Sequence, residues 1–102
     1  MTNTVLFQRT KDELILVERQ IRMLRIAKEN QPIGIIRLSE LMNLPNHKVR
    51  YTLRLLERDG LVIATADGAV VTDRYEEFLD EVGRDLKELT ETMDRIRKRL
   101  PD

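Results

Sequence analysis

The sequence predicts a mainly α-helical domain of the α+β class that continues into a long C-terminal helix. The 4 glycines, 3 prolines and 4% aromatic residues are too few for a β-sandwich or β-barrel. Apolar residues recur at a spacing of three to four along most of the chain, which indicates amphipathic helices. Two β-rich runs around Asp67-Gly68 predict a single hairpin. We therefore expect one globular domain over residues 1–72 and a helical extension over residues 73–102.

The length and charge of the chain limit the kind of protein that it can be. With 102 residues it can form one small core, and a partner subunit would add to the surface that it buries. The net charge is zero, but residues 1–58 carry 11 Lys and Arg against 6 Asp and Glu, whereas residues 59–102 carry 7 against 12. This asymmetry favours a surface for a polyanion in the first part of the chain.

Several classes of protein are excluded or disfavoured. The absence of cysteine and the presence of 1 histidine exclude a disulfide scaffold and a Cys/His zinc site. The opening MTNTVLFQRT lacks the features of a signal peptide, and no apolar run is long enough to span a membrane. No glycine-rich phosphate loop or nucleophile–base pair occurs. We expect a cytoplasmic, nucleoid-associated protein that is not an enzyme and has no cofactor or metal.

The first half of the chain predicts two helices separated by a short strand. Thr10 and Glu13 form a capping box that opens a helix with two apolar stripes, which ends before Pro32. Residues 33–36 are apolar and β-branched, so we expect a brief strand there. A short helix follows over residues 37–43, with Leu38, Leu41 and Met42 facing inward.

The second half predicts a third helix, the hairpin and the final helix. The third helix spans residues 46–59 with Asn46 as a possible cap, and Gly60 supplies the left-handed position that ends it. The hairpin pairs residues 61–64 with residues 69–71. Thr72 or Asp73 caps the last helix, which continues to about residue 100, before a proline.

This order of elements resembles the winged helix-turn-helix fold of transcription regulators. The matching residues are Leu38-Ser39-Glu40-Leu41-Met42-Asn43-Leu44, then Val49, Leu53 and Leu56-Glu57, and finally Gly60-Leu61-Val62. The resemblance covers about residues 12–72. It implies that the third helix is a recognition helix whose N-terminal half enters the major groove of DNA.

The outward face of the third helix carries residue types that bind DNA. With Val49, Leu53 and Leu56 inward, it presents Asn46, His47, Lys48, Arg50, Tyr51 and Arg54. Such side chains contact base edges or neutralise phosphates, although many solvated helix faces have the same composition. Two interpretations remain open for Tyr51, which either stacks on a sugar or packs on a neighbouring helix. His47 alone does not make a metal site.

The hairpin tip departs from the pattern of DNA-binding wings. Residues 65–69 carry Asp67 and no lysine or arginine, whereas many wings place a basic side chain in the minor groove. A carboxylate there is repelled by phosphates. Either the third helix binds DNA without the wing, or the domain binds another protein instead.

The last helix predicts a homodimer. Its apolar residues follow an unbroken heptad pattern at Tyr75, Leu79, Val82, Leu86, Leu89, Met93, Ile96 and Leu100. Residues 73–91 hold 8 acidic and 3 basic side chains, whereas residues 92–100 hold 1 and 4. Antiparallel pairing brings each acidic stretch near the partner's basic end. The seam is about 39 Å long at about 1.5 Å per residue, close to the spacing of about 34 Å between successive major grooves.

A winged helix followed by such a helix resembles small archaeal DNA-binding proteins and, more distantly, the MarR-type regulators. The resemblance implies a homodimeric transcription regulator or chromatin-like protein that binds double-stranded DNA. The alternative is a winged-helix module that binds protein without DNA. The sequence names no operator, regulated gene or effector ligand, and does not distinguish repression from activation.

Overall fold

The computed structural model describes residues 5–102 and confirms the predicted fold class, a mainly helical α+β fold with a long C-terminal helix. Residues 1–4, which belong to the opening segment considered above, lie outside the described residues. The chain divides after Thr72 into two compact units. The elements, in order, are α1 (Val5–Asn30), α2 (Ile35–Met42), α3 (Asn46–Arg58), β1 (Val62–Thr65), β2 (Gly68–Val71) and α4 (Tyr75–Arg99).

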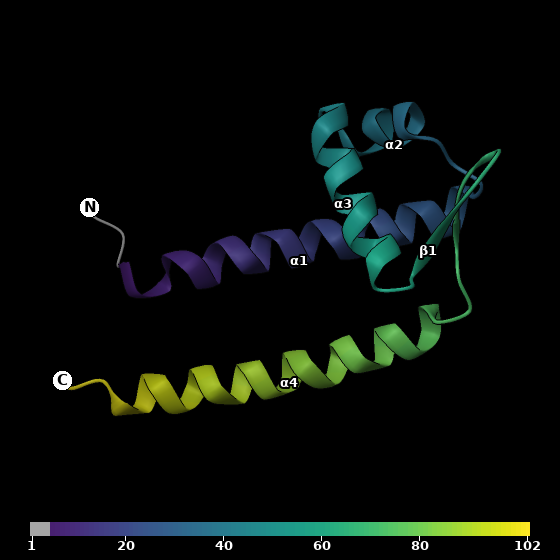
Figure 1. Ribbon diagram of the computed structural model, residues 1–102. Helices are drawn as coiled ribbons and strands as arrows, with labels where there is room; N and C mark the ends of the chain where they lie inside the picture. Colours follow the sequence, from purple (N-terminus) through teal and green to yellow (C-terminus); the bar gives the residue numbers. More distant parts are fainter. Residues whose placement is uncertain (1–4) are drawn as a thin grey trace. The chain divides into compact units, whose positions relative to one another are not determined.

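The core of the first unit forms on the C-terminal half of α1. Figure 1 shows α2 and α3 against this half, while the N-terminal half extends past them. Met23, Leu24 and Ala27 are fully buried there, whereas Ile15 is 56% exposed. The helix begins at Val5 and not at Thr10, so the predicted capping box lies inside it. A capping box is a local signal that does not stop a helix from continuing upstream.

The predicted strand at residues 33–36 is reduced to one bridge. Ile33 donates its N–H to the carbonyl of Ala69 at 3.1 Å and accepts from the Ala69 N–H at 2.7 Å. The chain then enters α2 at Ile35, and the other outward N–H of β2, that of Val71, donates to the Gln31 side chain at 2.8 Å. Leu38 and Met42 are buried as expected, but Leu41 is 38% exposed, so its predicted inward position is wrong.

A tight turn joins α2 to α3. Asn43 adopts a left-handed conformation with φ 54° and ends α2, a conformation that asparagine tolerates better than most residues. Ser39 donates its hydroxyl to the carbonyl of Leu44 across the turn. The carbonyl of Pro45 accepts hydrogen bonds from Lys48 and Val49 at 3.1 and 3.2 Å. Pro45 is thus the N-cap of α3, and the predicted cap, Asn46, is the first helical residue.

The hairpin follows α3 through Gly60, whose positive φ of 75° confirms the predicted helix end. Its register pairs Val62 with Val71 and Thr65 with Gly68. At the base, Thr72 donates its N–H to Leu61 and its hydroxyl to Gly60. Thr72 thus closes the hairpin base, three residues before α4 begins at Tyr75. The α1–α2–α3–β1–β2 arrangement is compatible with a winged helix.

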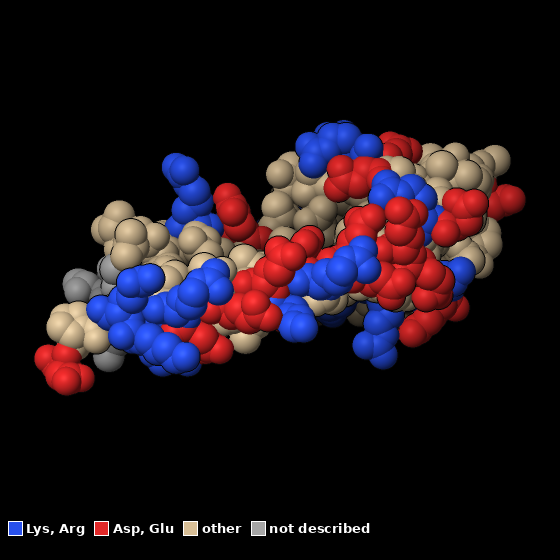
Figure 2. All heavy atoms as spheres, turned by 90° about the horizontal axis from the view of Figure 1, so that it is seen from below, with Lys and Arg blue, Asp and Glu red and all other residues tan. Residues whose placement is uncertain are grey.

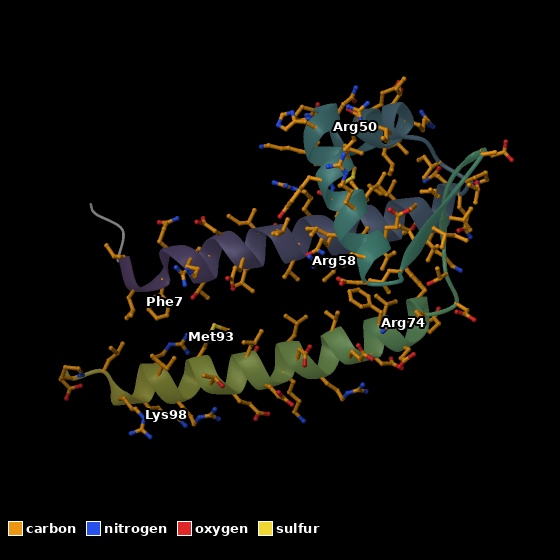
Figure 3. All side chains as sticks on the ribbon, in the orientation of Figure 1. Phe7, Arg50, Arg58, Arg74, Met93 and Lys98 are labelled. Carbon is orange, nitrogen blue, oxygen red and sulfur yellow. The ribbon has the colours of Figure 1, made fainter. Side chains whose placement is uncertain are left out.

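The second unit is the single helix α4, with Arg74 as its N-cap in place of the predicted Thr72 or Asp73. None of its residues is buried. Met93 and Lys98 project from opposite sides of the helix (Figure 3), as the heptad pattern predicts for a seam and a solvated face. Basic side chains gather toward its C-terminal end (Figure 2). Within residues 5–102, every helix is too short or too polar to span a lipid bilayer.

Candidate nucleic-acid interface

Helix α3 is anchored by a narrow buried face. Val49, Thr52 and Leu56 are fully buried, and Leu53 is half-buried, as the predicted inward stripe required. The sequence analysis did not place Thr52 in the core, because threonine is polar. Its hydroxyl donates to the carbonyl of Lys48 at 2.7 Å, so the burial leaves no polar group unsatisfied. The anchored face fixes which side chains of α3 point outward.

All six predicted contact residues of α3 are exposed, but they do not share one line along the helix. At about 100° per residue, His47, Tyr51 and Arg54 fall on one stripe opposite the buried face. Arg50 borders this stripe, whereas Lys48 and Asn46 lie on its two flanks. Tyr51 is 50% exposed, which leaves its ring available for contact with a ligand.

The same stripe includes Arg58, which the sequence analysis missed. Arg58 follows Arg54 by four residues, so the spacing alone was a sufficient signal. Its side chain is 72% exposed and its Nε lies 3.6 Å from the carboxylate of Asp59. Figure 3 shows Arg50 in the first half of α3 and Arg58 in its last turn. The stripe therefore spans the whole helix.

Three cations on or beside the stripe are available to an anion, whereas Arg58 lies next to Asp59. Among residues 5–102, no salt bridge involves Lys48, Arg50 or Arg54. Arg37 on α2, a neighbouring cation, pairs with Glu40 at 3.9 Å, and both side chains are more than half exposed. Guanidinium groups donate in a planar fork that matches a phosphate or the O6/N7 edge of guanine. The arrangement can therefore bind a polyanion along α3.

The hairpin tip offers no such cation. Asp67 is exposed, and its backbone N–H donates to the Thr65 hydroxyl at 3.2 Å. That hydroxyl donates in turn to the carbonyl of Gly68 at 2.7 Å. No lysine or arginine lies between Arg58 and Arg74 in the sequence. The tip of the hairpin thus presents a negative charge.

A groove of about 290 Å³ lies between α3 and β1. Sequence reasoning missed it, because it forms only where α2, α3, β1 and β2 meet. Its lining is mostly apolar, with three charged side chains from α3. The lining residues are Ile35, Arg50, Leu53, Arg54, Glu57, Val62, Ile63, Ala64 and Ala69.

Over the described residues there is no cluster of three or more His, Asp or Glu side chains that could hold a metal ion. His47, the one histidine, is exposed on α3.

Comparison with known proteins finds a similar solved structure but no similar sequence family. No protein-family model matches it, and no curated protein matches it. Among solved structures, it is similar to the activation domain of the phage T4 transcription factor MotA, with a TM-score of 0.57 and 18% identity. The match covers 74% of this chain and 81% of that domain. A likeness at this identity shows a shared fold.

Proposed function

We propose that this protein is a DNA-binding regulator of transcription, or a chromatin-like protein, that places α3 in the major groove. The observation that carries the proposal is the stripe of His47, Tyr51, Arg54 and Arg58, flanked by Arg50, on a helix that follows a tight turn. The fold likeness to a domain of a phage transcription factor supports a role in transcription. Such a protein acts in the cytoplasm at the nucleoid.

The test is binding to mixed-sequence duplex DNA by fluorescence anisotropy at several salt concentrations. Each phosphate contact contributes about −0.9 to the slope of log K against log salt. The double variant Arg50→Ala/Arg54→Ala is expected to make this slope less steep by about 2 and to weaken binding.

The matched control is Arg25→Ala/Lys28→Ala, which removes two exposed cations from α1 and changes the net charge equally. It is expected to bind nearly as the parent does. Equal losses in the two double variants would show that the net charge alone matters, and no binding at low salt would refute the proposal.

We also propose that two copies pair through antiparallel α4 helices. Leu86, Leu89, Met93, Ile96 and Leu100 are between 42% and 65% exposed, although a coiled-coil seam is stable only when covered. The acidic first turn, with Glu76 and Glu77, and the basic last turn, with Arg97, Lys98 and Arg99, favour the antiparallel orientation. Leu79 and Val82 are half-buried and continue the seam.

Sedimentation equilibrium tests the dimer. Met93→Ala/Ile96→Ala is expected to weaken dimerisation at least about a hundredfold, since both copies lose two apolar side chains. Glu91→Ala/Lys98→Ala changes two side chains off the seam at constant net charge and should leave the dimer intact. A parent chain that sediments as a monomer would refute the pairing.

One observation favours a second candidate function, a winged-helix module that binds protein without DNA. The hairpin tip presents Asp67 and no cation, so this hairpin does not favour the minor groove. A salt-insensitive partner would support this candidate, because counterion release dominates DNA binding. Under either candidate we propose that the protein is not an enzyme. The resemblance to archaeal and MarR-type regulators stays a prediction.

A further inference from the structure

The groove between α3 and β1 has the chemistry of a peptide site more than of a phosphate site. Six of its nine lining residues are apolar. Three charged side chains of α3 complete the lining, namely Arg50, Arg54 and Glu57. Its volume of about 290 Å³ corresponds to roughly ten water molecules, enough for one or two side chains. A phosphate group, by contrast, offers no apolar surface to cover such a floor.

The open edge of β1 adds backbone partners at this groove. Both the N–H and the carbonyl of Ala69 bond to Ile33, on the far side of β2 from β1. In an antiparallel pair, the residue opposite then also points its N–H and carbonyl outward. That residue is Ala64, which is exposed and lines the groove. The next outward residue, Val62, is only 2% exposed, so Ala64 supplies the one accessible rung within the described hairpin.

The two arginines of the groove favour a ligand that carries a carboxylate. Arg50 and Arg54 both line it, and neither forms a salt bridge within residues 5–102. A carboxylate beside an apolar side chain would satisfy the guanidinium groups and cover the floor at Leu53 at the same time. An extended segment would also bond to the N–H and carbonyl of Ala64.

We propose that this groove binds a short extended segment of a partner protein, in which an acidic residue adjoins a large apolar residue. The acidic side chain meets Arg50 and Arg54, the apolar side chain fills the groove, and the backbone pairs with Ala64. The proposal does not depend on DNA binding. Because the two arginines also belong to the proposed DNA surface, a bound segment and DNA would compete for them.

The test selects a displayed library of random eight-residue peptides against the full chain, with counter-selection against Ala64→Pro. Proline removes the outward N–H of Ala64 and is tolerated at a strand edge when that N–H faces solvent. Enriched peptides are expected to carry Asp or Glu next to a large apolar residue. An enriched peptide, titrated into ¹⁵N-labelled protein, should shift the amides of Leu53, Ile63 and Ala64 at saturation.

Further variants test whether the peptide binds in this groove and not elsewhere on the protein. Arg50→Gln/Arg54→Gln should weaken peptide binding by at least about tenfold, as expected for a lost charged hydrogen bond. Tyr51→Ala alters the outer stripe alone and should leave peptide affinity unchanged. Ala64→Pro should keep whatever DNA affinity the parent has, so the two proposals can fail separately. The ¹⁵N spectrum of each variant verifies its fold.

The proposal is overturned if no peptide is enriched over the counter-selection, or if the enriched peptides lack an acidic residue. It is also overturned if a short DNA duplex, and no peptide, shifts the amides of Leu53, Ile63 and Ala64. That outcome would assign the groove to the nucleic-acid backbone.

Discussion

The glycine at the start of β2 provides a quantitative test of how the hairpin is attached. Gly68 has φ 128°, a conformation that side chains with a Cβ rarely adopt. A Cβ built there would lie 2.6 Å from the carbonyl carbon of Ile33 and 2.8 Å from its nitrogen and oxygen. These are backbone atoms, so no side-chain rotation relieves the overlap. Gly68→Ala must therefore push β2 away from Ile33 or change the turn.

The magnitude follows from the two effects. The backbone conformation costs about 1–3 kcal/mol with a Cβ present. When β2 moves away from residue Ile33, the two hydrogen bonds between Ile33 and Ala69, at 3.1 and 2.7 Å, are also lost. Each is worth about 1 kcal/mol. We expect Gly68→Ala to lower the free energy of unfolding by about 3–5 kcal/mol.

The matched control is Gly34→Ala. Gly34 has φ −91° and ψ 172°, which alanine adopts freely, and a Cβ there meets nothing within 4 Å. Its effect should stay within about 0.5 kcal/mol. Urea unfolding monitored by circular dichroism gives the two values, and hydrogen exchange at the Ile33 and Ala69 amides locates the loss. Similar values for the two variants, or unchanged protection of these amides, would refute the reasoning.

Two further predictions concern α1 and α4. Arg22 donates from Nη2 to the carbonyl of Met42 at 3.0 Å in a partly buried position, so Arg22→Ala should cost about 1–2 kcal/mol by urea unfolding. Arg25→Ala removes an exposed pair with Glu29 and should cost less than about 0.5 kcal/mol; equal costs would contradict the role of the Met42 contact. Gly83→Ala places a Cβ in open space within α4 and should raise the melting temperature, through about 1 kcal/mol of helix propensity. A lower melting temperature would instead indicate that another chain approaches this position closely.

The sequence was sufficient for elements whose signals are local and strong. The amphipathic pattern of α3, Gly60 at its end and the hairpin after it each predicted what the structure contains. The hairpin turn lies at Ala66-Asp67, however, and Gly68 is already the first residue of β2. Residues 33–36 were predicted wrongly because a β-branched run shows strand propensity and not the presence of a partner strand. The predicted cap of α4 was also wrong, because the helix begins at Tyr75 and its N-cap is Arg74, which has no capping side chain.

The sequence likewise predicted one part of the candidate site and not another. The outward position of Arg54 and Tyr51 follows from helical spacing, and Arg58 could have been added on the same basis. The groove could not be predicted, because its walls come from α2, α3, β1 and β2, which are brought together only by packing. Whether the stripe on α3 binds DNA is still a prediction.

The turn at the end of the hairpin has a consequence for how such a protein can change its targets. Among the described residues other than glycine, only Asn43 has a positive φ, so the backbone at Ala66 and Asp67 does not require glycine. The side chain of Asp67 is exposed, and the turn depends on its backbone N–H rather than on its carboxylate. One substitution, Asp67→Lys, would therefore reverse the charge of the tip at little cost in stability. Evolution can alter the electrostatic preference of this hairpin in a single step, with the core and α3 left unchanged.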